Sequence, residues 1–265
     1  MPSVSNIAVG ALVAGSAASK ARHGMNESIA RLSTGMRSMY GGDAAGQSVA
    51  NTLQARSMSW AVAARNAEDG ISAAQTAEAA LLEIAALAQR LRELGIQADN
   101  AALLSTTADV AAMNAEAEAL YDSIDAIVSK ATFNGVSLIG TGPKEHYIGV
   151  TDDGASGVTL TTAETITAVT SYTQANNADV TADVTLKEVA LSLGNVAAGI
   201  AALKGRQAVA YAASANLAAA AARIEDTDFA KETANLAKNS VLNQSAMAMV
   251  AQANQAQSAI LAVLQ

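Results

Sequence analysis

The C-terminal stretch from Asn239 to Gln265 carries no Asp, Glu, Lys or Arg, and this absence constrains the fold more than any other feature. Its apolar and small residues recur at alternating steps of four and three, the repeat of a helix that buries a narrow seam against another helix. The other positions include many Gln, Asn and Ser residues, whereas an isolated surface helix normally carries charges. Several amide side chains would be unfavourable inside a membrane. We therefore expect this helix to be surrounded by other protein.

The opposite end of the chain shares this character. Met1 to Ser19 contains no charged side chain, and mostly small residues follow the same repeat. Two uncharged helices at opposite termini can pair with each other, and we predict that they do so in the core of a polymer. The residues predicted to form this core seam are Ile7, Met25, Leu32, Leu242, Met249, Ile260 and Val263.

The composition supports long helices rather than a thick globular core. Apolar residues make up 51% of the chain but aromatic residues only 3%, and alanine, the best helix former, supplies much of the difference. A net charge of −8 argues against nucleic-acid binding, and the absence of Cys excludes disulfides and thiolate sites. The apolar run Ile7 to Ala14 lacks the preceding basic residues of a signal peptide, so we interpret it as retained structure.

The chain divides into long helical segments around one β-hairpin. Helices are predicted over residues 1–35, 47–102, 105–130 and 185–223, the last opened by a capping box at Thr185–Glu188, and a final helix follows the acidic run Glu225–Asp228. Asn134-Gly135 predicts a turn, and the alternation near residues 144–162 predicts a β-hairpin. Residues 163–184 are a variable middle, expected to be a loop or a short helix.

The predicted fold class is therefore mainly α, a long antiparallel helical bundle or coiled coil with one small β-hairpin, in which the discontinuous N- and C-terminal halves pair. Residues 1–46 and 224–265 should form a terminal coiled-coil domain. Residues 47–140 and 141–223 should form a helical rod. Its inward positions are predicted to include Val49, Leu53, Trp60, Ile71, Leu81, Leu91, Met113, Ile124, Val189, Val196, Leu203 and Val209.

No pattern indicates an enzyme, a cofactor or a metal site. The two histidines, His23 and His146, lie far apart and are interpreted as surface or structural residues. Asp152-Asp153 is interpreted as a hairpin turn, since the same pair occurs in turns more often than in calcium loops. The glycines between Gly41 and Gly46 lack the Lys-Ser/Thr of a phosphate loop, so they form a connector.

Several ordered motifs resemble the bacterial flagellins. The N-terminal signature is matched by Glu27 to Arg37 (ESIARLSTGMR), Gly42 to Gln47 (GDAAGQ), Arg65 to Ser72 (RNAEDGIS), Gln89 to Leu94 (QRLREL) and Thr132 to Gly135 (TFNG). The C-terminal signature is matched by Arg223 to Phe229 (RIEDTDF) and Met249 to Asn254 (MVAQAN). Each motif alone is weak, but together and in order they are specific.

The resemblance implies a structural subunit of the flagellar filament that self-assembles into a helical tube for motility. It implies inner coiled-coil and rod domains without the outer domains of large flagellins, and export through the flagellar type III apparatus without signal cleavage. The implied location is extracellular. The implied partners are further copies of the chain, an export chaperone, and the cap and junction proteins, with no nucleic acid and no membrane.

The resemblance also implies a contact patch at Gln89, Arg90, Glu93 and Leu94, with Glu116 on the following helix. In flagellins this patch contacts neighbouring subunits and is also recognised by the vertebrate flagellin-sensing Toll-like receptor. The simpler interpretation is a solvated helix face with ion pairs three or four residues apart.

Two other functions remain open at this point. A hook–filament junction protein shares the terminal pattern, although the RIED-like and QAN-like motifs favour flagellin. A helical signalling module would have one symmetrical hairpin tip, whereas a β-hairpin is predicted between these rods.

Overall fold

The computed structural model describes residues 3–37, 42–100, 107–166 and 175–264. Within the helices, the side chains of residues 3–8, 107, 176, 260, 261, 263 and 264 lie outside this description. The chain forms two compact units, which we call the terminal unit (Met1–Gln54 with Leu217–Gln265) and the rod unit (Ala55–Asn216). The predicted domains were 1–46 with 224–265, and 47–223. Their boundaries therefore differ from those of the two units, which lie after residues 54 and 216.

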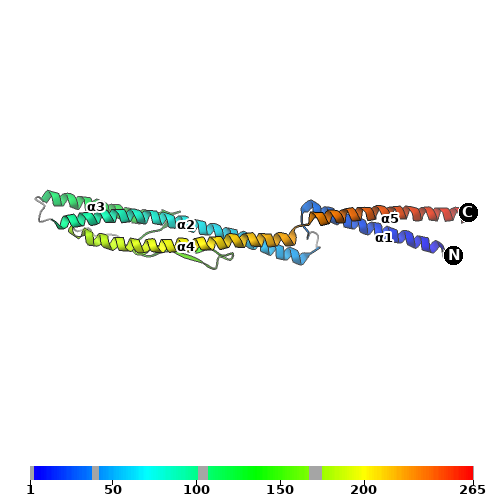
Figure 1. Ribbon diagram of the computed structural model, residues 1–265, viewed down its shortest axis with the longest axis horizontal. Helices are drawn as coiled ribbons and strands as arrows, with labels where there is room; N and C mark the ends of the chain where they lie inside the picture. Colours follow the sequence, from blue (N-terminus) through cyan, green and yellow to red (C-terminus); the bar gives the residue numbers. More distant parts are fainter. Residues whose placement is uncertain (1–2, 38–41, 101–106, 167–174, 265) are drawn as a thin grey trace. The chain divides into compact units, whose positions relative to one another are not determined.

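Two long helices make up most of the terminal unit. Helix α1 spans Ser3–Thr34 and α5 spans Phe229–Leu264, and they run antiparallel so that both termini lie at the same end of the pair (Figure 1). The apolar residues buried between them are small: Ala18, Ala21 and Ala246 are 4%, 6% and 9% exposed. Small residues let helix backbones approach closely, but each buries little apolar area.

The connectors of the terminal unit are fastened to each other by backbone hydrogen bonds. Gly35, with a φ of 72°, ends α1 in the left-handed conformation that favours glycine. The Gly35 carbonyl accepts a hydrogen bond from the Thr227 amide at 2.8 Å, and the Arg37 amide donates to the Glu225 carbonyl at 2.7 Å. Asp228 caps α5 by accepting from the Lys231 amide at 3.1 Å, as the acidic run predicted.

Helices α2 (Ala44–Asp99), α3 (Thr107–Lys130) and α4 (Ala178–Glu225) build the rod unit, apart from the first residues of α2 and the last of α4. Within this unit they lie side by side (Figure 1). One core cluster gathers fully or almost fully buried residues of all three helices, including Leu81, Ile84, Ile124, Val189 and Val196. A second cluster, around Leu91 and Leu94, packs against Tyr121 of α3 and Ala178 of α4.

Two antiparallel strand pairs cover one part of the helices. Strands β1 (Thr132–Phe133) and β2 (Val136–Ser137) flank a turn in which Asn134 and Gly135 have φ values of 49° and 79°. Two successive positive φ values define the type I′ turn that Asn-Gly favours, so the predicted turn is confirmed. Strands β3 (Lys144–Gly149) and β4 (Gly157–Ala163) form the predicted hairpin.

The start of α4 differs from the prediction. A short 3₁₀ helix, η3 (Ala175–Asn177), leads directly into α4 at Ala178. The prediction that a capping box at Thr185–Glu188 begins this helix is therefore wrong. Thr185 lies inside the helix, where its hydroxyl donates to the Thr181 carbonyl at 3.0 Å. Of the variable middle, residues 167–174 lie outside the described residues.

Most of the predicted inward positions of the rod are buried or half-buried. Two are wrong: Val49 is 50% exposed and Val209 is 56% exposed. Long helices with steps of three and four can be assigned more than one inward face. In α4 the buried face runs through Leu203 and Ala210, which turns Val209 outwards.

Candidate assembly surfaces

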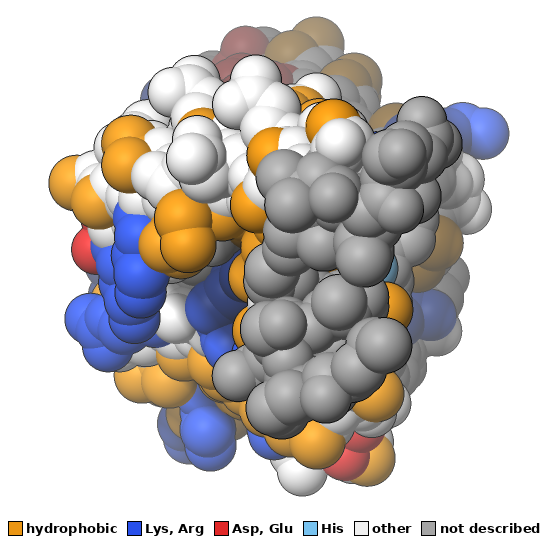
Figure 2. All heavy atoms as spheres, turned by 90° about the vertical axis from the view of Figure 1, so that its right-hand side faces the viewer, with side chains coloured by type: hydrophobic (Ala, Val, Ile, Leu, Met, Phe, Trp, Pro, Cys, Tyr) orange, Lys and Arg blue, Asp and Glu red, His pale blue; other side chains and the backbone are white. Residues whose placement is uncertain are grey.

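The terminal unit exposes large apolar side chains in a region without charge. Among the described side chains of the uncharged stretches of its two long helices, the exposed large apolar residues are Val9, Leu12, Val13, Val241, Leu242, Met247 and Met249, with exposed fractions between 48% and 75%. Figure 2 looks onto the side of the molecule at which the termini lie in Figure 1, and it shows hydrophobic side chains there, with Lys and Arg side chains also in view. Exposed apolar side chains in such number mark an interaction surface.

A shallow groove runs along this surface. It has a volume of about 440 Å³, and the residues that line it are Val9, Gly10, Val13, Ala14, Ala17, Ala246 and Met249. A Cβ atom added at Gly10 would meet nothing within 4 Å, so the groove is open there. Its floor of small residues between larger apolar ones can accept protruding apolar side chains.

The predicted core seam is only partly present within one chain. Met25 and Leu32 are half-buried. Leu242 is 48% exposed and Met249 is 65% exposed, so neither is buried between α1 and α5, where Ala246 lies instead. The side chains of Ile7, Ile260 and Val263 lie outside the described residues. The place of all seven in a filament core remains a prediction.

A buried polar cluster near the connectors was not predicted. Glu232 is 7% exposed and Ser28 is 2% exposed, and the Ser28 hydroxyl donates to Glu232 Oε1 at 2.7 Å. Arg31 Nη1 lies 3.7 Å from the same carboxylate. In the sequence Glu232 resembles an ordinary acidic residue in the first turn of a helix, so only the pairing of distant segments reveals this cluster.

The predicted contact patch is divided between surface and core. Gln89, Arg90, Glu93 and Glu116 are exposed, whereas Leu94 is only 1% exposed and packs beneath α3 and the start of α4. Leu94 is therefore a core residue in this chain, which corrects its assignment to the patch surface.

The charged part of the patch is an ion-pair network. Arg90 donates to Glu116 at 2.7 Å and to Glu93, three residues away on α2, at 3.0 Å. These two carboxylates raise the pKa of Arg90 above its ordinary value, and Glu116 is the larger cause. The network ties α2 to α3 and matches the simpler interpretation of the sequence.

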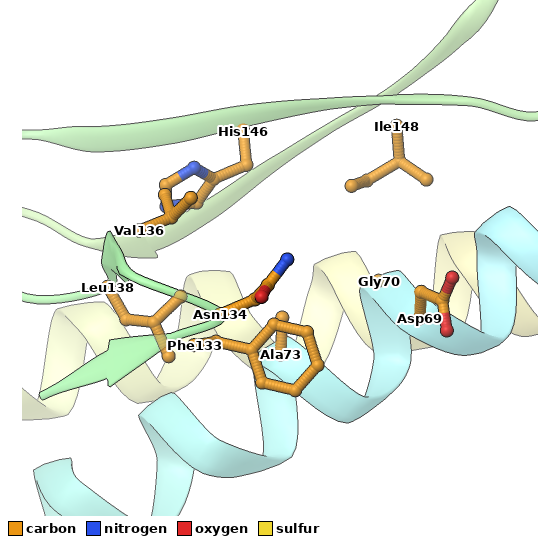
Figure 3. Close-up of a pocket in the computed structure, with 9 residues that line it drawn as sticks. All are labelled: Asp69, Gly70, Ala73, Phe133, Asn134, Val136, Leu138, His146 and Ile148. Atoms are coloured by element: carbon orange, nitrogen blue, oxygen red, sulfur yellow. The ribbon is translucent and has the colours of Figure 1, made fainter.

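A hollow of about 470 Å³ lies between α2 and the strand pairs (Figure 3). Gly70 and Ala73 of α2 face Phe133, Leu138, His146 and Ile148 from the strands and their connection. His146 Nε2 is buried without a hydrogen-bond partner among the described residues. Burial, and secondarily the charge of Lys144, lower the pKa of His146, so the structure favours the neutral imidazole.

The remaining titratable candidates have local roles. His23 is exposed and lies 3.5 Å from Glu27 on the same helix. Asp152 accepts from Arg56 at 2.7 Å, which fastens the β3–β4 turn to α2, and Asp153 accepts from Thr151 at 2.7 Å within that turn. No group of three or more His, Cys, Asp or Glu residues in the described part of the chain could hold a metal ion.

Comparisons with known proteins agree with the paired terminal helices. Residues 6–141 match the bacterial flagellin N-terminal helical region, and residues 181–264 match the bacterial flagellin C-terminal helical region. The chain belongs to the bacterial flagellin family. Flagellin of Bacillus subtilis is 32% identical over 90% of this chain and 92% of its own length. Flagellin of Halalkalibacterium halodurans is 33% identical over 90% of this chain and 91% of its own.

Two further similarities are to a filament core protein and to a flagellin of known structure. The flagellar filament 33 kDa core protein of Treponema phagedenis is 31% identical over 91% of this chain and 92% of its own. The crystal structure of Bacillus cereus flagellin aligns with 58% of this chain and 88% of its own, at 25% identity and a TM-score of 0.41.

The two flagellin regions correspond to the N-terminal and C-terminal sets of helices. The N-terminal region covers most of α1 with α2, α3 and the β1–β2 pair, and the C-terminal region covers most of α4 with α5. The β3–β4 hairpin lies between the two matched regions, and no outer domain is apparent among the described residues.

Flagellins are structural proteins, so the surfaces above are the relevant sites. Helices α2 and α4 are long and apolar enough to cross a membrane by length and composition alone. Packed helices of soluble proteins meet the same criterion, and both helices here pack around the rod core.

Proposed function

We propose that this flagellin is a structural subunit of an extracellular flagellar filament and has no enzymatic activity. The main supporting observation is the terminal unit, where the uncharged stretches of α1 and α5 expose seven large apolar side chains among the described residues, from Val9 to Met249, around an open groove. This surface is best buried by the same uncharged surface of another copy of the chain, because a charged partner would find no counter-charges there.

The terminal pair is expected to become fully ordered only when neighbouring subunits cover it. Fixing the backbone costs about 1–2 kcal/mol per residue, and a seam of alanines returns little apolar burial. Coupling this ordering to polymerisation would keep free subunits from aggregating before they reach the growing end.

Further partners follow from the family. We propose export through the flagellar type III apparatus without signal cleavage, assisted by an export chaperone, and contacts with cap and junction proteins at the filament ends. The exposed Arg90, Glu93 and Glu116 would contact neighbouring subunits. The same charged patch could be offered to the vertebrate flagellin-sensing Toll-like receptor by free monomers, without Leu94, which is buried.

The first experiment is polymerisation of the purified chain with filament seeds or a precipitant, observed by electron microscopy. We expect long tubes of uniform width, which disappear when residues 240–265 are removed. Circular dichroism of the truncated chain should still report the rod helices, which separates loss of assembly from loss of folding. Persistent monomers despite seeding would favour the junction-protein function instead.

A further inference from the structure

The apolar seam between α1 and α5 discriminates poorly between helix registers. Its buried apolar members, Ala18, Ala21 and Ala246, are all alanines. Sliding one helix along the other by seven residues brings further alanines into contact, because the small residues on both helices follow the same repeat. Met25 and Leu32, the larger apolar side chains of the predicted seam, are only half-buried, so apolar burial gives a weak preference between the registers that a further feature can strengthen.

The buried polar cluster at the connector end provides this distinction. Glu232 is nearly buried, and its carboxylate accepts from Ser28 at 2.7 Å and from Asn235 at 3.4 Å, with Arg31 at 3.7 Å. A slide of seven residues would place Ala21 or Gly35 where Ser28 now lies. Neither residue has a side-chain donor, so a buried carboxylate would lose a hydrogen bond, which is a costly loss.

A steric contact about two turns further along α5 depends on the same register. A Cβ atom added at Gly24 would lie 2.6 Å from Asn239 Nδ2, so the end of the Asn239 side chain rests against Gly24 and would have to turn aside for a larger residue. After the same slide, Asn239 would face Ala17 or Arg31, both of which carry a side chain. This contact therefore adds a smaller preference for the register that the carboxylate cluster selects.

We propose that Ser28, Arg31 and Glu232, together with Gly24 opposite Asn239, set the register of the terminal coiled coil. The inference rests on the proposed assembly function, because register decides which side chains of α1 and α5 flank the groove presented to neighbouring subunits. Buried ion pairs contribute little net stability compared with apolar residues of similar size, whereas single buried polar residues specify register in coiled coils. These residues therefore fix the position of α5 along α1 and add little to the stability of the helix pair.

Disulfide trapping in filaments tests the register directly, because the chain has no cysteine of its own. Ala17 and Ala246 line the same groove, so the pair Ala17→Cys with Ala246→Cys reports the observed register. The pair Ala17→Cys with Ala253→Cys reports a slide of one heptad and uses the same type of substitution. Filaments are oxidised, dissolved without reductant, and scored for cross-linked chains of monomer size, which excludes bonds between subunits.

With Ser28 and Glu232 intact, we expect the first pair to cross-link and the second to remain reduced. In Ser28→Ala with Glu232→Leu, the slipped pair should cross-link to at least a tenth of the in-register yield, while the filaments retain their helix content. Glu232→Gln, which can still accept from Ser28, should preserve the observed register. Equal trapping patterns in all three backgrounds would overturn the inference.

Two other results are interpretable. If the unsubstituted chain forms no filaments, the proposed function fails, and the register inference fails with it. If only the double variant fails to polymerise, Ser28→Ala alone provides the test, and it should lower the ratio of in-register to slipped cross-links at least threefold. An unchanged ratio in that single variant would reject the role of the cluster.

Discussion

At the scale of single residues, glycines allow helices to approach at defined points. Gly95 of α2 is buried, and a Cβ atom there would lie 2.8 Å from Asp179 Cβ and 2.9 Å from Asp179 Cα in α4, and closer still to the Asp179 amide nitrogen. From the sequence alone Gly95 is only a weak point in a helix. The structure explains it as the space that the first turn of α4 requires.

Replacing Gly95 by Ala should therefore destabilise the rod unit. Overpacking against backbone costs about 1–3 kcal/mol, and the better helix propensity of Ala returns up to about 1 kcal/mol. We expect the free energy of unfolding, measured in urea, to fall by about 1–2 kcal/mol. The matched control is Gly194→Ala in α4, where a Cβ would meet nothing within 4 Å. It should stabilise the chain, and equal effects of both substitutions would contradict this account.

His146 should make the stability of the rod unit depend on pH. Burial and then Lys144 lower its folded pKa, so the unfolded chain binds a proton more readily than the folded chain. Stability should be full above the unfolded pKa of about 6.5 and should decline as pH falls through that value towards the lower folded pKa.

Urea unfolding between pH 7.5 and about 5.5 measures this slope, in a window where the unfolded His146 gains its proton. Asp69 lines the same hollow and would oppose the effect if it approached the ring. The variant His146→Gln should flatten the slope, and His23→Gln, at an exposed position, should leave it unchanged. A slope that survives His146→Gln belongs to other groups.

At the scale of elements, the sequence predicted helices and turns where local chemistry determines them. Asn134-Gly135 and Asp228 have local signatures, and both act as predicted. The start of α4 was missed because it depends on tertiary packing: Ala178 and Ala182 are fully buried against α2 and α3. This packing outweighs the capping-box pattern at Thr185. The Thr185 hydroxyl instead donates a hydrogen bond to the Thr181 carbonyl in the preceding turn of the helix.

The β3–β4 hairpin should contribute to the rod core as a structural element. Leu160 of β4 is fully buried in the main core cluster, while its neighbour Thr159 is exposed on the opposite face of the strand. We expect Leu160→Ala to lower the free energy of unfolding by about 2–5 kcal/mol, because it removes buried methyl groups and leaves a cavity. Thr159→Ala should change it by less than about 0.5 kcal/mol. Similar small effects would mean that the hairpin unfolds independently of the helices.

At the scale of the whole molecule, the pairing of the two termini followed from two uncharged stretches with one repeat. The sequence could not assign which members of that repeat face inwards, because alanine fits either side of a small-residue seam. Leu242 and Met249 were therefore placed in a seam that Ala246 occupies within one chain. Leu94 was assigned to the patch surface by resemblance, although α3 and α4 cover it. The seam of the filament core remains a prediction, whereas the position of Leu94 was missed because long-range packing, rather than local pattern, decides its exposure.

This exposure of Met249 makes a sharp test of assembly. The side chain is 65% exposed beside the groove, so Met249→Asp should leave the folding of a single chain unchanged. In a filament, an Asp at this site would be buried among uncharged residues and would lose its hydration without gaining a counter-charge. We expect Met249→Asp to abolish seeded polymerisation, while the thermal unfolding of its rod unit matches that of the unsubstituted chain.

The matched control is Met249→Gln, which has a similar length, carries no charge and resembles the glutamines already present in α5. It should polymerise on seeds, because an amide can find partners on a polar lining whereas a lone carboxylate remains charged. Ile260→Asp, placed in the same predicted core, should behave like Met249→Asp. Normal filaments from either Asp variant would show that the exposed side of α5 faces solvent in the assembly, and the uncharged surface would then need another explanation.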